Sequence, residues 1–432
     1  MIVLNLPAIV FANGLMVSKE LLNRPLVLSS VAKKSNGLVN YSKAYIVKFG
    51  QRDDRLSLTN SNGEVNYEFE ILARTDAGVE INFEEGLKSI SFQSSIFKTE
   101  LPLTHSQLKR HVLPSKVFKK VKIDTQNNKQ IIATIALNVP GYDFIRIELV
   151  PDTSQFFKAK MHSYEDKVGV YSTFPLQNAK QFAARQSLPA TYEYDQKFPE
   201  ELISVLKDAV KYWNKALGGK FIKLVKTNSK KRAQKIGTHY IDYYANRDED
   251  GGARGVFNLH PHNGKILSSY IYVPSGFKVW GTKYFKEKFP TVSDKKIKRA
   301  VLDYLTHTLA HEIGHSLGLR HNFAASHESN LTVHNFDKVF DRYLKKAKVS
   351  KRIKPSSSIM DYISIDYFTL MGAKMRKHQK ALSYDKKAIR WIYFDRTPKT
   401  FGSYCTHFDE PPTLENGGTD FCQAWDEPHL KK

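Results

Sequence analysis

Three histidines and one glutamate lie close together in the stretch HEIGHSLGLRH. Residues four apart share one face of a helix, so His311 and His315 can offer their imidazoles to one metal ion. Glu312 follows the first histidine, where its carboxylate can take a proton from a water at that ion. Gly318 can adopt the left-handed backbone conformation that ends a helix and turns the chain, so that His321 arrives as a third ligand. Three imidazoles with a fourth position left for water are the donor set of one catalytic Zn²⁺ ion.

This stretch resembles the signature of the metzincin zinc peptidases, H-E-x-x-H-x-x-G-x-x-H, and matches it at every fixed position. The clan also has a methionine turn, which the sequence SIMDY at residues 358–362 supplies. The resemblance implies that Met360 forms an apolar floor beneath the metal and that Tyr362 approaches the metal or the reacting carbonyl. Two further stretches, HNFAAS (321–326) and YDKKAIRW (384–391), resemble a bacterial subfamily of exported metzincin-like proteins.

The combination of motifs favours a metal site over chance. A bare H-E-x-x-H also occurs in helices whose histidines are structural, but the third histidine, the glycine and the methionine turn are independent requirements. An inactive relative could keep the histidines, and the presence of Glu312 argues against that reading. We therefore expect a zinc metalloendopeptidase that cleaves proteins or peptides, with Tyr362 stabilising the oxyanion.

Two alternatives stay open from the sequence. One is a basic cell-surface or cell-wall binding protein with a non-catalytic zinc site, and the other is a hydrolase of peptidoglycan cross-bridges. Both draw on the charge of the chain, in which 66 Lys and Arg outnumber 43 Asp and Glu to give a net charge of +23. Such a charge attracts anionic partners, whether cell wall, membrane headgroups or nucleic acid, without choosing among them. Residues 220–235 hold seven basic residues and no acidic one, for which a solvated loop is the favoured reading over an anion-binding patch.

The ends of the chain bear on its compartment. Its only cysteines are Cys405 and Cys422, and we expect them to form a disulfide that staples a tail without its own core. The alternative is a pair of free thiols, since neither lies in a Cys-x-x-Cys motif. Residues 1–30 begin with an apolar run that is either the end of a signal peptide lacking its basic part or a first strand. No apolar run is long enough for a transmembrane helix. We expect an exported bacterial protein, periplasmic, secreted or at the cell surface, and the sequence leaves its oligomeric state open.

The pattern of elements predicts an α+β protein. Short β-branched and aromatic runs separated by turns indicate an antiparallel β-rich domain over residues 31–165. A metzincin-like catalytic domain follows over residues 166–400, with a mixed sheet that begins β-α-β-β, an active-site helix and the methionine turn, and residues 401–432 form the tail. SNG at residues 61–63 indicates a hairpin turn.

The clan pattern also implies a substrate-binding sheet edge upstream of the zinc helix. Our candidate edge is Val256, Phe257, Asn258 and Leu259, which would bind a substrate backbone as an added strand. Among the other histidines, we expect His307 to be a packing residue or to support a ligand, and we expect surface or loop positions for His260, His262 and His334.

Overall fold

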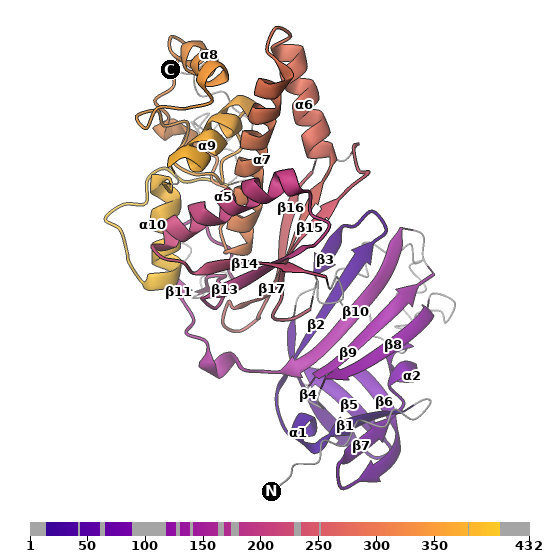
Figure 1. Cartoon of the computed structure of the whole chain (residues 1–432). Helices are drawn as coiled ribbons and strands as arrows, with labels where there is room; N and C mark the ends of the chain where they lie inside the picture. The colour runs from indigo at the N-terminus through magenta and orange to yellow at the C-terminus, as the bar shows by residue number, and fades with distance from the viewer. Residues whose placement is uncertain are drawn as a thin grey trace, which may run out of the picture. The chain divides into compact units, whose positions relative to one another are not determined.

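The computed structural model describes most of the chain (Figure 1). The described residues are 14–406, except 42–43, 61–64, 89–117, 127–129, 139–140, 163–167, 174–180, 229–234, 250–251 and 379. The predicted turn at residues 61–63 and the apolar start of the chain up to residue 13 therefore lie outside the described residues. Contacts divide the chain into two compact units: Met1–Lys158 with Asn258–Pro261, and Ala159–Phe257 with His262–Lys432. The domain borders predicted at residues 30, 165 and 400 stay predictions.

The N-terminal unit is built on one antiparallel sheet. Its strands are β1 (Leu15–Ser18), β2 (Leu26–Lys34), β3 (Val39–Tyr41), β4 (Tyr45–Arg52), β5 (Arg55–Asn60), β6 (Val65–Thr75), β7 (Gly78–Ile81), β8 (Phe118–Gln126), β9 (Gln130–Leu137) and β10 (Tyr142–Pro151), with short helices α1 (Lys19–Leu22) and α2 (Phe83–Lys88). The order is β1-β7-β6-β5-β4-β2-β10-β9-β8, with β3 beside β2. One apolar cluster takes side chains from both ends of this order, such as Val17 in β1 and Ile135 in β9, so the sheet wraps around a shared core. The expected antiparallel β unit is confirmed.

The C-terminal unit has a five-stranded sheet in the order β14-β13-β15-β17-β16. The strands are β13 (Ala190–Asp195), β14 (Ile222–Thr227), β15 (His239–Tyr244), β16 (Arg254–Leu259) and β17 (Ile266–Pro274), and a small two-stranded sheet joins β11 (Met161–His162) to β12 (Gln181–Phe182). Strands β14, β13, β15 and β17 pair in parallel. Every residue of β17 is buried, as expected for an interior strand of a sheet covered on both faces. Strand β16 lies at the edge.

Helix α7 is the central helix of this unit. The helices are α5 (Glu200–Leu217), α6 (Gly276–Lys288), α7 (Asp294–Ser316), α8 (Phe336–Lys346), α9 (Ile365–His378) and α10 (Ser383–Phe394), with a 3₁₀ turn at Ala325–Glu328. A second 3₁₀ turn, at Ser154–Phe156, belongs to the N-terminal unit. Helix α7 packs against α5, α6, α9 and β17, and for that reason its residues from Tyr304 onward are buried all round rather than on one face. Ser293 occupies the expected N-cap position, with extended backbone angles but no side-chain capping bond.

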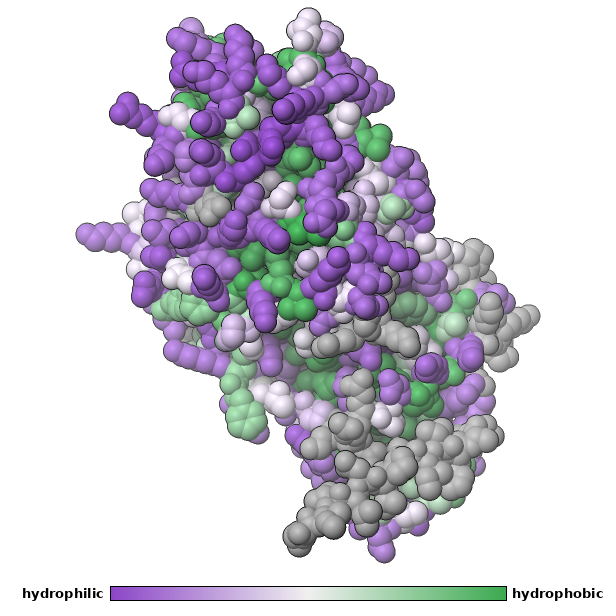
Figure 2. Space-filling view, in the orientation of Figure 1, coloured by the Kyte–Doolittle hydropathy of each residue, from purple (hydrophilic) through white to green (hydrophobic). Residues whose placement is uncertain are grey.

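The order of elements confirms the predicted β-α-β-β start of this unit, with β13, α5, β14 and β15 in sequence. Gly218 ends α5 in a left-handed conformation at φ 86°, and its N–H donates to the carbonyl of Asn214. No helix in the described part of the chain is long and apolar enough to cross a membrane. Hydrophilic side chains cover much of the face seen in Figure 2, in keeping with the large share of charged residues.

Candidate metal centre

Helix α7 carries the first two histidines of the motif on one face of its last turns. The ring centroids of His311 and His315 lie 4.7 Å apart with their planes nearly perpendicular, at 87°. Helix α5 stabilises this part of α7, because the indole N–H of Trp213 in α5 donates to the carbonyl of Ala310 (2.7 Å). The two histidines therefore lie on one face of the helix, as the sequence predicts, because residues four apart are one turn apart.

Gly318 brings the third histidine to the same place. It has φ 99°, and a Cβ at this position would overlap the carbonyl oxygen of Ala184. Only glycine fits a backbone that is both left-handed and this close to its neighbour. The chain then turns back, with the N–H of Leu319 donating to the carbonyl of Gly314 (3.0 Å), and His321 arrives opposite the helix.

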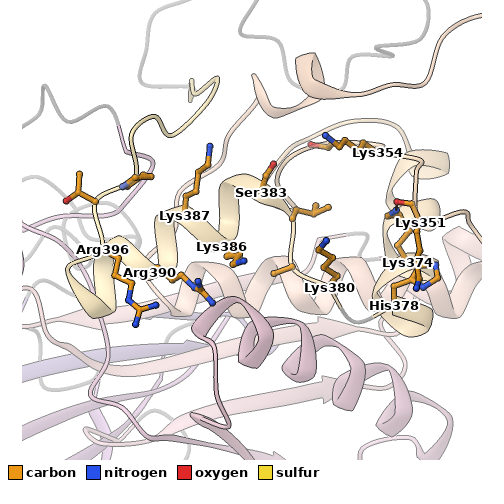
Figure 3. Close-up of a pocket in the computed structure, with 15 residues that line it drawn as sticks. Lys351, Lys354, Lys374, His378, Lys380, Ser383, Lys386, Lys387, Arg390 and Arg396 are labelled. Carbon is orange, nitrogen blue, oxygen red and sulfur yellow. Dashed lines mark hydrogen bonds between the residues drawn. The ribbon is translucent and has the colours of Figure 1, made fainter.

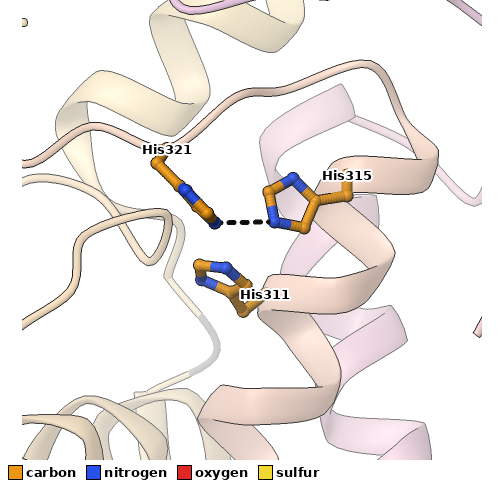
Figure 4. A group of neighbouring side chains, drawn as sticks. All are labelled: His311, His315 and His321. Carbon is orange, nitrogen blue, oxygen red and sulfur yellow. Dashed lines mark hydrogen bonds between the residues drawn. The ribbon is translucent and has the colours of Figure 1, made fainter. Parts of the chain in front are cut away.

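The three imidazoles converge on one point (Figure 4). One ligand atom from each of His311, His315 and His321 lies within 4.8 Å of the others. Among the described residues, these three form the group of side chains that could hold a metal ion. The Nε2 atoms of His315 and His321 are 3.0 Å apart. Two ligands of a tetrahedral zinc ion stand about 3.4 Å apart when each bond is about 2.1 Å long, so the rings need to move little to bind an ion.

Backbone carbonyls orient two of these rings. Nδ1 of His311 donates to the carbonyl of Ile359 (2.8 Å), and Nδ1 of His315 donates to the carbonyl of Leu319 (2.8 Å). These bonds leave the lone pair of each Nε2 facing the centre, which is the tautomer that a metal ligand needs. Nε2 of His311 is buried without a hydrogen-bond partner. A buried polar atom left in this way indicates a ligand.

Electrostatics favour a neutral ring at His311. Burial lowers the pKa of His311 well below its usual value, and the neighbouring His315 and His321 lower it further. A neutral imidazole is the form that binds a metal ion. A neutral His311, two rings oriented by backbone carbonyls and an unsatisfied ring nitrogen together fit a zinc ion.

Glu312 lies beside the ligands with its carboxylate buried. Burial raises the pKa of this carboxyl to about 8, while a hydrogen bond from the backbone N–H of Gly255 and the charge of Arg254 act in the opposite direction. Both of these residues belong to β16, the edge strand. A Cβ on Gly255 would lie 2.5 Å from the Glu312 carbonyl oxygen, so glycine permits the strand to approach the base this closely.

The methionine turn lies under α7. Met360 is fully buried, and a Cβ on Gly314 would overlap its sulfur and lie 2.7 Å from the indole of Trp213. The ring of Tyr362 stacks on His311, with 5.3 Å between centroids, and meets the ring of His321 at a tilt, with 4.2 Å between centroids. Met360 therefore packs against the zinc helix at Gly314, and Tyr362 lies against two of the imidazoles.

Comparison with known proteins gives one match. Residues 293–403 match the model of a family described as Met-zincin. This segment belongs to the metzincins. The family implies zinc at the three histidines. No curated protein and no solved structure matches the chain.

One residue near the candidate metal centre, Tyr171, could not be found from the sequence. Tyr171 has its ring centroid 6.0 Å from that of His315 and 5.0 Å from that of Phe257 in β16. Its position follows from an isolated antiparallel bridge between Val170 and Leu319, which lays residues 169–171 along the turn that follows the zinc helix. The sequence carries no catalytic signal there, because a lone tyrosine in a loop gives none.

A second missed residue, Asp385 in α10, holds the methionine turn of the metzincin segment in place. Its buried carboxylate accepts hydrogen bonds from the hydroxyl of Ser358, the N–H of Ile359 (2.9 Å) and the hydroxyl of Tyr212. Burial raises the pKa of Asp385 to about 6, against the opposing effect of these bonds. The stretch YDKKAIRW contained this residue, but only the tertiary structure gives it a role.

The candidate substrate edge is an edge strand. Residues 256–259 all lie in β16, which ends the sheet of the C-terminal unit. Val256 and Phe257 belong to that unit, whereas Asn258 and Leu259 are grouped with the N-terminal unit. Only the first half of the candidate edge therefore belongs to the unit that carries the histidines.

The remaining sequence expectations have mixed outcomes. His307 is buried and stacks on Phe368 at 4.1 Å between centroids, as expected of a packing residue. His262 and His334 are exposed. His260 lies in a loop, as expected, but not at the surface: it is only 1% exposed and its Nε2 lies 3.2 Å from a carboxylate oxygen of Asp152.

The predicted disulfide stays a prediction, because Cys422 lies outside the described residues. Cys405 itself is buried and packs with Phe323 and Ala324, beside Tyr362. The N–H of Phe323 donates to its carbonyl (2.9 Å). The start of the tail therefore lies next to the residues that follow His321.

Proposed function

We propose that this protein is a zinc-dependent metalloendopeptidase that hydrolyses peptide bonds in proteins or peptides. The observation that carries the proposal is the convergence of His311, His315 and His321, with ligand atoms within 4.8 Å of one another, beside the buried carboxylate of Glu312. A zinc ion bound there would supply Lewis acidity and lower the pKa of a water molecule to about 7.

Glu312 acts as the proton carrier in this proposal. Its carboxylate takes a proton from the attacking water and then donates it to the nitrogen of the leaving amine. The raised pKa, about 8 through burial, makes the carboxyl a stronger base than an exposed glutamate. The positive charge of a bound metal ion would act in the opposite direction and favour the ionised form.

Tyr362 is the proposed donor to the developing oxyanion. Its ring lies against His311 and His321, and burial raises its pKa above the usual value, so the phenol keeps its proton. A neutral phenol can donate a hydrogen bond to an oxyanion and stabilise the transition state.

We propose that the substrate binds in an extended conformation along the first half of β16. An exposed sheet edge offers backbone N–H and C=O groups to an added strand. The same strand reaches Glu312 through Gly255. A peptide paired with Val256 and Phe257 would therefore lie beside the base, and selection would depend on backbone more than on side chains.

The rival reading is a basic binding protein with a non-catalytic zinc site. Structural zinc sites are usually closed by four protein ligands, whereas catalytic sites keep a position open. The cluster in the described residues offers three, which favours a catalytic site. Hydrolysis of peptidoglycan cross-bridges would use the same residues on another peptide substrate, and a basic protein suits an anionic wall. We also propose that the protein is exported from the cell and acts in the periplasm, at the cell surface or outside the cell.

The test is Glu312→Gln in the full-length protein, with denatured casein as substrate and zinc measured by mass spectrometry. We expect zinc content to stay at one ion per chain and activity to fall about 10²–10⁴-fold, the usual contribution of a general base. Glu287→Gln is the matched control, because this glutamate is exposed on α6. It should leave both zinc and activity unchanged. Full activity in Glu312→Gln would refute the mechanism, and no chelator-sensitive cleavage by the wild type would favour the binding protein.

A further inference from the structure

We propose that a cleft in the C-terminal unit is a binding site for a flexible, linear oligoanion that carries closely spaced phosphate groups. The cleft has a volume of about 810 Å³, which lies within the usual range of ligand pockets, about 300–1,000 Å³. It is formed by the loop before the methionine turn, the end of α9, the start of α10 and the segment after α10 (Figure 3). None of its lining residues belongs to the metal centre.

The charge of the cleft exceeds what the basic composition of the chain explains. Eight of the fifteen lining residues are lysine or arginine, and none of these fifteen described residues is aspartate or glutamate. The whole chain, by comparison, contains 66 basic and 43 acidic residues. A surface that merely reflected the net charge would include carboxylates among the lysines, so the cleft is a selective concentration of positive charge.

The cations of the cleft have no acidic partner in the part of the chain that the structure describes. Lys351, Lys354, Lys380 and Lys386 are exposed, and no ion pair among the described residues neutralises any of these four. Glu328 touches the rim through the hydroxyl of Ser383 (3.5 Å) without pairing with them. Like charges gathered in a concave space repel one another, and a multivalent anion would relieve that repulsion.

Lys374 shows the effect of this crowding. Its ammonium group donates to the carbonyls of Ser350 and Lys351 (3.2 Å each), which keeps it at the wall of the cleft. Its pKa is lowered to about 8, first by burial and then by the charges of Lys380 and Lys354. A phosphate group beside these side chains would favour their protonated forms.

The shape of the cleft selects among anionic ligands. Its cations line a hollow rather than a flat face (Figure 3), and a bilayer surface or a rigid duplex cannot enter a hollow of this volume. A flexible single chain can enter and bring several charges to the lysines at once. Arg390 and Lys387 also reach the cleft, and a guanidinium group binds phosphate in a bidentate manner.

The cleft adjoins the support of the methionine turn. Ser356, one of its lining residues, donates to the carboxylate of Asp361 in that turn (3.0 Å). Leu382, another lining residue, donates its N–H to the hydroxyl of Tyr212 (3.1 Å), which in turn donates to Asp385. The ligand would thus bind behind the scaffold of the metal centre, as a site separate from it.

The test measures binding of sodium tripolyphosphate by isothermal titration calorimetry. The variant replaces Lys351, Lys354, Lys380 and Lys386 by Gln, and the control replaces four exposed lysines elsewhere in the same unit, Lys207, Lys223, Lys295 and Lys296, by Gln. Both variants lose the same net charge. Tripolyphosphate binds zinc, so the zinc content is measured before and after each titration. An oligomer of glycerol phosphate is titrated in parallel to distinguish a phosphodiester polymer from free oligophosphate.

We expect the wild type to bind tripolyphosphate at one site and the cleft variant to bind at least tenfold more weakly, with the control within twofold of the wild type. Equal weakening of both variants would overturn the proposal, since net charge alone would then explain binding. It would also be overturned if vesicles of phosphatidylglycerol or duplex DNA bind the wild type while tripolyphosphate does not.

A second measurement needs no variant. The wild type is labelled with an amine-reactive acetylating reagent with and without tripolyphosphate, and modified lysines are quantified by mass spectrometry. We expect the ligand to reduce labelling at least fivefold at Lys351, Lys354, Lys380 and Lys386, and to leave Lys207 and Lys295 unchanged. Uniform protection, or no protection at the cleft, would overturn the proposal even if a variant failed to fold.

Discussion

Replacement of Gly318 by Ala should weaken both the fold and the metal centre. Gly318 has φ 99°, and an L-residue forced into the left-handed region costs roughly 1–2 kcal/mol. Its Cβ would also lie 2.9 Å from the carbonyl carbon of Ala184 and overlap the oxygen. Overpacking of this kind costs roughly 1–3 kcal/mol. The two effects together predict a loss of about 2–5 kcal/mol in the free energy of unfolding.

Gly237→Ala separates these two effects. Gly237 has a similar angle, φ 83°, but a Cβ there would meet no atom within 4 Å. It should therefore lose only about 1–2 kcal/mol through backbone strain. The difference between the variants, about 1–3 kcal/mol, measures the close approach to Ala184. Urea denaturation of the zinc-free proteins gives both values.

Zinc affinity provides the second readout for the same pair. Since His321 follows Gly318 by three residues, a shift of this turn displaces the third ligand, and we expect affinity to fall about 10–100-fold, as when a residue that orients a ligand is lost. Competition with a chromophoric chelator measures this. Gly237→Ala should bind zinc like the wild type. If Gly318→Ala is no less stable than Gly237→Ala and binds zinc normally, the turn at Gly318 does not position His321.

Three further predictions concern the surroundings of the metal. Tyr362→Phe should lower kcat about 10²-fold with little change in KM, as for loss of one oxyanion donor; an unchanged kcat would exclude that role. Trp213→Phe removes the donor to the buried carbonyl of Ala310 and should destabilise the protein by about 1–3 kcal/mol in urea denaturation, and a neutral outcome would mean that water replaces the bond. The pKa of Asp385 is raised to about 6 in the folded protein, against about 4 in the unfolded chain. The protonated carboxyl therefore favours the folded state, and this stabilisation is complete below pH 4 and is lost as the pH rises through 6. Between pH 4 and 7 the zinc-free wild type should therefore lose up to about 3 kcal/mol relative to Asp385→Asn, and parallel pH profiles of the two proteins would contradict this assignment.

Local patterns in the sequence were sufficient for the zinc helix and for most of the neighbouring strands. The spacing of His311 and His315 needs only helix geometry, and the left-handed turn at Gly318 needs only the permissiveness of glycine. The same reasoning predicted β16 as a separate strand. Its position at the edge of the sheet came from the resemblance to the clan, not from the strand pattern.

Residues that act through tertiary contacts could not be predicted. Tyr171 reaches His315 from 144 positions earlier in the chain, and Asp385 supports the methionine turn from the next helix but one along the chain. The basic cleft draws its lysines from separate segments between residues 351 and 396, none of which is a long basic run. None of the described lining residues comes from the one run noted in the sequence, residues 220–235. The buried position of His260 beside Asp152 depends in the same way on residues 108 positions apart.

Ile359 gives the metal centre a further property. Its N–H donates to Asp385 in α10 (2.9 Å), and its carbonyl accepts from the ring of His311 in α7 (2.8 Å). One peptide residue thus joins the last helix of the unit to the first ligand. In the proposed zinc peptidase, retention of the metal would therefore report whether the chain has folded as far as α10, the last helix of its described part. A molecule damaged or unfinished there would lose the support of His311, and with it the metal and the proposed activity.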